Sequence, residues 1–150
     1  MLDKKFGTAG DTIVIEEFMT GREVSVLSFV DGKTIRTMTS AQDHKRAKDG
    51  DQGLNTGGMG TFSPSPFYTP EVDEFCKKYI YQKTVDAMAS EGRPFKGIIF
   101  FGLMLTADGP KVLEYNARFG DPEAQVVLPR MENDIIEVME ACVDGNLDQV

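Results

Sequence analysis

Cysteine is scarce in this sequence, and basic side chains are outnumbered by acidic ones. The two cysteines in 150 residues, Cys76 and Cys142, lie far apart and lack the C-x-x-C spacing typical of zinc or redox sites. We expect reduced thiols, and a disulfide between them is disfavoured. Lys and Arg number 16 against 24 Asp and Glu, which gives a formal net charge of −8. Such a surface repels nucleic acid.

Long hydrophobic runs are also absent. The longest apolar run, residues 97–105, is too short to span a bilayer, and residues 1–20 show no basic segment followed by an apolar one, as a signal sequence would. We therefore expect a soluble, cytoplasmic protein without a nucleic-acid or membrane partner. Hydrophobic residues make up 41% of the chain, which is enough for one packed core.

The hydrophobic pattern predicts strands in the first and last thirds of the chain. Short apolar runs at residues 12–17 and 23–29 are separated by a Thr-Gly turn, and Asp31-Gly32 marks a hairpin into residues 33–37. A second hairpin, at Asp108-Gly109, joins residues 97–105 to residues 110–117. The sequence therefore predicts an antiparallel sheet.

Helical spacing appears in two places. Pro70 opens a helix whose apolar positions recur at helical spacing to near Gly92. Residues 132–144 form the second, with Gly145 as its stop. Residues 40–65 lose periodicity and accumulate Gly, Asp, Asn and Lys, so we expect a long loop that carries function. The fold class is α+β, an antiparallel sheet flanked by helices.

The sharpest chemical pattern is KVLEYNARFGDPE, residues 111–123. On an extended strand, side chains alternate, so Glu114, Asn116 and Arg118 should project from one face. A carboxylate and an amide oxygen two residues apart suit Mg²⁺, which takes oxygen ligands and fills its remaining positions with water and phosphate. Arg118 would face the same phosphates. The solvated face of an edge strand explains the same alternation.

The segment EYNARFGDPE, the loop AQDHKRAKDGDQGLNTGGMG and the segment VIEEFMTGREVSV resemble the phosphoribosylamine-glycine ligases, a family of the ATP-grasp superfamily. The resemblance covers nearly the whole chain in the right order. It implies that residues 11–150 form the larger, carboxy-terminal lobe of an ATP-grasp fold and that residues 1–10 are a remnant of the small lobe. The amino-terminal substrate domain and the carboxy-terminal domain of such a ligase are then absent.

The activity implied by the resemblance is ATP-dependent joining of glycine to 5-phosphoribosylamine in purine biosynthesis, through glycyl phosphate. The isolated chain is expected to be inactive. Another ATP-grasp carboxylate-amine ligase, or a non-catalytic nucleotide-binding module, is the alternative.

The resemblance also assigns roles to residues of the last segment. Glu114 and Asn116 become ligands of Mg²⁺ or Mn²⁺, and Arg118 contacts the transferred phosphoryl group, with Asp121 beside it in catalysis. Asp121 and Glu123 could instead cap the following turn, and capping is the favoured interpretation for Asp121. Many ATP-grasp enzymes carry an acidic metal ligand on the preceding strand, but residues 98–105 contain no carboxylate. The number of metal ions stays open.

Nucleotide binding is assigned to the segment before residue 24. Glu16, Glu17, Phe18 and Met19 resemble the hinge at which backbone groups read the adenine edge and an apolar side chain covers the ring. Glu23 suits the ribose hydroxyls, because a carboxylate accepts two hydrogen bonds. From the pattern alone, these glutamates are ordinary exposed charges that flank strands.

Substrate binding is assigned to the glycine-rich loop. Its glycines leave backbone N–H groups free to approach an anion, although a flexible surface turn has the same composition. His44 could equally be a hydrogen-bonded structural residue. The residues expected to bind glycine and the 5-phosphate of phosphoribosylamine are Asp43, His44, Lys45, Arg46, Asn55, Thr56, Gly57 and Gly58.

Overall fold

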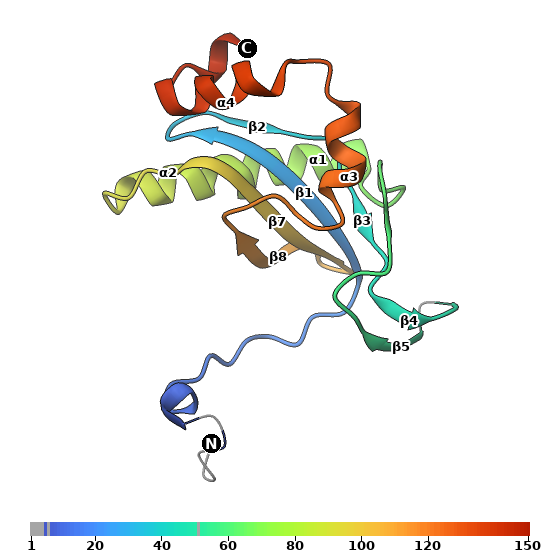
Figure 1. Ribbon diagram of the computed structural model, residues 1–150. Helices are drawn as coiled ribbons and strands as arrows, with labels where there is room; N and C mark the ends of the chain where they lie inside the picture. Colours follow the sequence, from blue (N-terminus) through green and yellow to red (C-terminus); the bar gives the residue numbers. More distant parts are fainter. Residues whose placement is uncertain (1–4, 6, 51) are drawn as a thin grey trace.

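A computed structural model describes residues 5, 7–50 and 52–150. Its centre is an antiparallel sheet with the strand order β2-β1-β7-β8 (Figure 1). The strands are β1 (Arg22–Asp31), β2 (Ile35–Thr37), β7 (Lys96–Thr106) and β8 (Gly109–Asn116). The predicted antiparallel sheet and both of its hairpins are confirmed.

The sheet lies between two helical layers. Val24, Val26 and Phe101 face the long helix, whereas Leu27 and Phe100 contact α3 on the opposite face. Because β1 and β7 are covered on both faces, their central residues are buried without clean alternation, and β7 is a nearly continuous apolar run. β8 is an edge strand and remains partly exposed.

The first helical layer is one long helix. It consists of α1 (Pro70–Cys76), a π-helical turn, η2 (Lys77–Tyr81), and α2 (Gln82–Ser90). Thr69 caps this helix by accepting a hydrogen bond from the Val72 N–H. Pro70 suits the first turn, because backbone N–H groups there have no partner within the helix and proline has no N–H. The helix predicted to begin at Pro70 is confirmed, but the π-helical turn was not predicted.

The second layer follows β8. Its elements are α3 (Ala124–Val127), η3 (Leu128–Arg130), α4 (Ile135–Asp144) and η4 (Leu147–Gln149). Only α4 was predicted, with its start three residues too early.

The ends of α4 explain its boundaries. Asp134 caps the helix by accepting the Ile136 N–H at 2.8 Å. Gly145 ends it with φ 79°, a left-handed conformation that glycine adopts without steric cost. The predicted stop at Gly145 is confirmed.

The strand predicted at residues 12–17 is wrong. A 3₁₀ turn, η1 (Gly7–Gly10), precedes an irregular segment that extends away from the domain (Figure 1). Val14 and Ile15 are 82% and 87% exposed. A strand needs a neighbour for its backbone hydrogen bonds, and within the described residues nothing pairs with this segment.

The loop predicted at residues 40–65 contains short strands. β3 (Gln42–Asp43) pairs with β6 (Thr61–Phe62), and β4 (Arg46–Lys48) pairs with β5 (Gln52–Asn55). The absence of hydrophobic periodicity hid them, because backbone hydrogen bonds and not apolar burial hold these strands. The loop is therefore more ordered than predicted.

Three further expectations concern the chain as a whole. Cys76 and Cys142 are buried, free thiols, as predicted. In the part of the chain that the structure describes, no helix has the length and apolar character needed to cross a bilayer. The expected small-lobe remnant, residues 1–10, includes residues 1–4 and 6, which lie outside the described residues.

Candidate functional site

A row of small and polar residues crosses the centre of the sheet on the face that α3 covers. Ser25 of β1 pairs with Gly102 of β7, and Gly102 pairs with Glu114 of β8. Glu23 lies two residues before Ser25 and therefore on the same face. The side chains of Glu23, Ser25 and Glu114 thus belong to one surface, although they come from strands far apart in the sequence.

Glu114 lies over Gly102. A Cβ atom placed on Gly102 would come within 2.8 Å of Glu114 Cγ. The register shifts at this point, because Leu103 pairs with Val112 and Leu113 has no partner across the strand. The bulge precedes Glu114, so Glu114 and Asn116 keep the regular alternation and lie on one face, as predicted.

Alternation does not extend to Arg118. β8 ends at Asn116, and the exposed Arg118 follows in a bend, where its Nη1 donates to the backbone oxygen of Phe119 at 2.9 Å. The expectation that Arg118 shares the strand face with Glu114 is therefore wrong. After the strand, a bend and a turn lead into α3, which begins at Ala124.

Ser25 connects the sheet to α3. Its Oγ donates to Glu123 Oε1 at 2.9 Å, and Glu123 is only 3% exposed. Glu123 is also the N-cap residue of α3, without a capping hydrogen bond from its side chain. The capping role predicted for Asp121 is wrong, because that residue lies before the cap and its carboxylate accepts a hydrogen bond from Gln125 Nε2 at 2.8 Å.

Lys45 lies among the carboxylates of this face. Its Nζ forms an ion pair with Glu23 Oε2 at 2.8 Å. Burial alone would lower the pKa of Lys45, but the hydrogen bond to Glu23 and the charges of Glu23, Glu114 and Asp43 raise it. Lys45 therefore neutralises part of this surface.

Negative charge still predominates there. Burial raises the pKa of Asp43, and the nearby charge of Glu123 raises it further. The Oδ1 atom of Asp43 is buried and lacks a hydrogen-bond partner among the described residues. On the sheet face itself, Glu23, Asp43, Glu114 and Glu123 outnumber Lys45, so this face favours cationic ligands, whereas Arg22 and Arg46 border the adjoining cleft.

A cleft of about 240 Å³ opens beside Glu23 and Lys45. It brings together the segment expected to bind nucleotide and the loop expected to bind substrate. The expected residues that line it are Phe18, Met19, Glu23, Asp43, Lys45, Arg46 and Asn55. Glu16 and Glu17 are exposed and do not line it; Glu17 instead forms an ion pair with Lys111 at 2.7 Å.

The remaining loop residues mainly hold the loop together. Thr56 Oγ1 donates to the backbone oxygen of Lys45 at 2.8 Å and accepts the Gly58 N–H at 3.1 Å. His44 is exposed, and its backbone N–H donates to the Gly60 oxygen at 2.8 Å. In this conformation, the donors of Thr56 and Gly58 are used within the loop, while Gly57 lies between them.

The oxygen ligands on β8 suit a divalent cation. Within residues 5, 7–50 and 52–150, no three His, Cys, Asp or Glu side chains are grouped so as to hold a metal ion. Glu114 and Asn116 provide a carboxylate and an amide oxygen, which matches Mg²⁺, an ion commonly held by one or two carboxylates together with water and substrate phosphates. The residues present therefore fit a metal that enters with a phosphate ligand.

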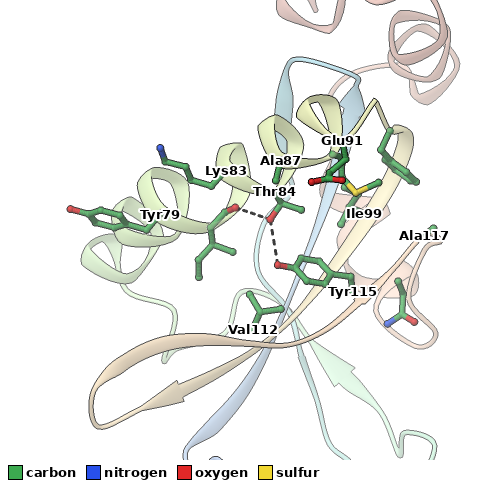
Figure 2. A pocket seen from close by; sticks show the side chains of 13 residues that line it. Tyr79, Lys83, Thr84, Ala87, Glu91, Ile99, Val112, Tyr115 and Ala117 are labelled. Atoms are coloured by element: carbon green, nitrogen blue, oxygen red, sulfur yellow. Dashed lines mark hydrogen bonds between the residues drawn. The ribbon is translucent and has the colours of Figure 1, made fainter. Parts of the chain in front are cut away.

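A larger cavity, about 650 Å³, lies on the other face of the sheet between α2 and β8 (Figure 2). Its lining is mainly apolar and includes Val112 and Ile99, and Tyr115 points toward Thr84 with 3.5 Å between their hydroxyl oxygens. Asn116, the last residue of β8, also borders this cavity. The larger cavity is thus mainly apolar, whereas the charged residues gather on the opposite face of the sheet.

Three residues of the site were not assigned from the sequence. Ser25 and Gly102 are a hydroxyl and a glycine inside apolar strands, and a strand glycine often marks a close approach by another group. That signal was available for Gly102. Glu123 was considered only as a possible cap of the turn after β8, and the fold shows that it is buried against Ser25.

Comparison with known proteins supports this description. Residues 1–124 match the model of the phosphoribosylglycinamide synthetase ATP-grasp (A) domain. The chain is 54% identical over 150 residues to a bifunctional purine biosynthetic protein of Schizosaccharomyces pombe, covering 100% of this chain and 19% of that protein. It is 51% identical over 145 residues to a phosphoribosylamine-glycine ligase of Brucella melitensis, covering 97% of this chain and 34% of that protein.

A solved structure agrees. The phosphoribosylamine-glycine ligase of Thermotoga maritima superposes with a TM-score of 0.76 at 33% identity, over 87% of this chain and 33% of that one. The chain spans about a third or less of the length of these relatives. The predicted ATP-grasp fold is confirmed, and the chain belongs to the phosphoribosylglycinamide synthetase ATP-grasp (A) domain family.

Proposed function

We propose that this chain is the nucleotide- and metal-binding part of an ATP-dependent ligase that joins glycine to 5-phosphoribosylamine. The observation that carries the proposal is the gathering of Glu23, Asp43 and Glu114 around Lys45 on one face of an ATP-grasp sheet. Relatives named as this ligase support the choice of substrates. Residues 1–10 belong to the small lobe of the ATP-grasp fold and residues 11–150 to its larger lobe.

Nucleotide binds in the cleft between residues 16–23 and the loop. Phe18 and Met19 cover the adenine ring, and Glu23 accepts hydrogen bonds from ribose. Glu16 and Glu17 lie just before the cleft lining on the chain, and we assign their backbone groups to the adenine edge. The cleft lining supports this arrangement for Phe18, Met19 and Glu23.

Glu114 and Asn116 hold Mg²⁺ or Mn²⁺. Held there, the ion would supply neutralisation of charge on the phosphate oxygens, which is most of what phosphoryl transfer requires. Arg118 and Asp121 follow directly on the chain, and we assign Arg118 to the transferred phosphoryl group and Asp121 to its orientation. Both side chains are exposed and able to turn toward a ligand.

The reaction has two steps. The glycine carboxylate oxygen attacks the γ-phosphorus of ATP, the bond to the β-phosphate oxygen breaks, and ADP leaves glycyl phosphate behind. The amine of phosphoribosylamine then attacks the acyl carbon, phosphate leaves, and the amine loses a proton as the amide forms. The loop residues 43–58 bind both substrates and exclude water, which would hydrolyse the acyl phosphate.

The test measures ADP release by the complete ligase that contains this chain, with Mg²⁺ and ATP. Release should require glycine and phosphoribosylamine together. Glu114→Ala should reduce it by about 10²-fold or more, the usual effect of removing a group that stabilises transition-state charge, whereas the exposed Glu137 of α4 gives a matched Glu137→Ala control without effect. The 150-residue chain alone should release no ADP.

Two outcomes would contradict the proposal. Release with a different acid and amine would show another ATP-grasp carboxylate-amine ligase. Tight nucleotide binding without release from any substrate pair, unchanged by Glu114→Ala, would show a non-catalytic nucleotide-binding module.

A further inference from the structure

We propose that Gly102 of β7 is a positioning residue for Glu114, because it provides the space in which the Glu114 side chain lies across the sheet. The proposal rests on the proposed function in one respect, namely that Glu114 holds a divalent cation. It concerns a strand that contributes no carboxylate of its own to the site. β7 contributes space, because Gly102 has no side chain.

The geometry is specific to this pair of residues. The nearest atoms to a Cβ built on Gly102 all belong to Glu114: Cγ at 2.8 Å, Oε1 at 3.5 Å and Cδ at 3.6 Å. A Cβ contact under 3.0 Å forces one of the groups to move. Any residue other than glycine at position 102 therefore displaces Glu114.

Backbone conformation does not explain this glycine. Its φ lies outside the positive range that favours glycine, unlike those of Gly97 and Gly109 near the two ends of the hairpin. An alanine at position 102 would adopt the same strand geometry without backbone strain. The remaining explanation for glycine at position 102 is that it leaves space for the Glu114 side chain.

The neighbours on β7 make this space a recess. Phe100 and Met104 lie two residues away on either side and on the same face, and both are large and buried. Gly102 thus forms a gap one residue wide between two bulky side chains, and Glu114 fills it. From this gap, the Glu114 carboxylate reaches the centre of the face, where its charge interacts with Lys45.

The recess has a consequence for metal binding. With Gly102 present, the Glu114 side chain lies over position 102, and the next residue across the sheet in this row is Ser25. A methyl group at position 102 would turn the Glu114 side chain outward past the edge of the sheet. The carboxylate would remain, but its oxygens would leave the position from which they meet a phosphate-bound cation.

The experiment uses Gly102→Ala in the complete ligase and two measurements. The affinity for Mn²⁺ in the presence of ADP should weaken about tenfold, as is usual when a residue that orients a metal ligand is changed. The electron paramagnetic resonance signal of free Mn²⁺ measures this affinity. The thermal midpoint should fall in the otherwise unchanged protein but not in the Glu114→Ala background, where the Cγ atom that would clash is gone. That dependence on background separates an effect through Glu114 from general damage to the strand.

Equal loss of thermal midpoint in both backgrounds, or unchanged Mn²⁺ binding by Gly102→Ala, overturns the proposal. If Gly102→Ala does not fold, the double variant Gly102→Ala/Glu114→Ala must fold for the proposal to stand. Neither Mn²⁺ binding nor the thermal midpoint needs glycine or phosphoribosylamine. If both measurements give the expected results but the complete ligase releases no ADP, the proposed ligase reaction is refuted and the role of Gly102 stands.

Discussion

Asp31 offers the sharpest stability prediction. It is a carboxylate with 2% exposure at the end of β1. Its Oδ1 accepts the N–H groups of Lys33 at 3.0 Å and Thr34 at 2.7 Å, and its Oδ2 accepts the N–H of Leu147 at 3.0 Å. The same side chain therefore closes the hairpin to β2 and attaches η4 to it, over a sequence separation of 116 residues.

The variant Asp31→Asn isolates the second of these connections. The amide oxygen can replace Oδ1 in the hairpin, but the amide nitrogen would then face the Leu147 N–H, so one buried donor loses its acceptor. An unsatisfied buried donor costs about 1–3 kcal/mol. Asp31→Ala removes the acceptor of all three N–H groups and should cost about 3–5 kcal/mol, because several donors then lose their partner together.

The pH dependence has a definite sign. Burial tends to raise the pKa of Asp31, but the hydrogen bonds from Thr34, Lys33 and Leu147 outweigh it and lower the pKa below the ordinary value of 3.8. A carboxylate with a lowered folded-state pKa contributes stability that is present above its unfolded-state pKa and lost as pH falls through its folded-state pKa. The difference between the native protein and Asp31→Asn should therefore be constant near neutral pH and shrink below about pH 4.

Urea denaturation at several pH values, together with amide hydrogen exchange at Leu147, measures both effects. Exchange at Leu147 should accelerate in Asp31→Asn while exchange at Thr34 changes little. Unchanged exchange at Leu147, or a stability difference that grows as pH falls, would refute this reasoning.

Two predictions concern the candidate site. Ser25→Ala should destabilise the protein by about 1.5–3 kcal/mol, because the buried Glu123 loses a hydrogen bond to its charge; denaturation measures this, and no change would show that water replaces the hydroxyl. Lys45→Met should raise the pKa of Asp43 further, since Lys45 now lowers it. Carboxyl ¹³C titration of Asp43 detects the shift, and a lower pKa would contradict the inferred charge distribution.

Much of the fold could be predicted because its signals are local. The hairpins at Asp31-Gly32 and Asp108-Gly109, the proline at the start of the long helix and the glycine after α4 each act through their own backbone conformation. These signals need no knowledge of the remainder of the structure. The strand and helix boundaries they define were accurate to within a few residues.

Other features depend on partners that the sequence does not reveal. Residues 12–17 have strand-like composition, but within the described chain no neighbouring strand satisfies their backbone groups. The short pairs β3 with β6 and β4 with β5 have no hydrophobic period, because their residues are mostly exposed. Composition alone therefore predicted a strand at residues 12–17 that does not form, and it missed the short strands within residues 40–65.

In the candidate site, too, local signals predicted some features, and others depend on partners distant in the sequence. Glu114 and Asn116 were placed on one face from strand alternation, and the register confirms it. Alternation could not show that β8 ends before Arg118, nor that Ser25, Gly102 and Glu114 align across three strands. That alignment depends on pairings between residues 25 and 102 and between residues 102 and 114, which only the folded sheet establishes.

The charge on this face bears on the form in which nucleotide binds. Free ATP carries negative charge toward a surface where Glu23, Asp43, Glu114 and Glu123 outnumber Lys45, so its phosphates are repelled. Lys45 is also held by Glu23, and phosphate must compete with a carboxylate for it. A divalent cation removes the first obstacle, because it neutralises phosphate charge and is attracted to Glu114. Nucleotide affinity measured by calorimetry should therefore rise on adding Mg²⁺, and affinity that is equal with and without the metal would mean that the phosphates bind away from this face.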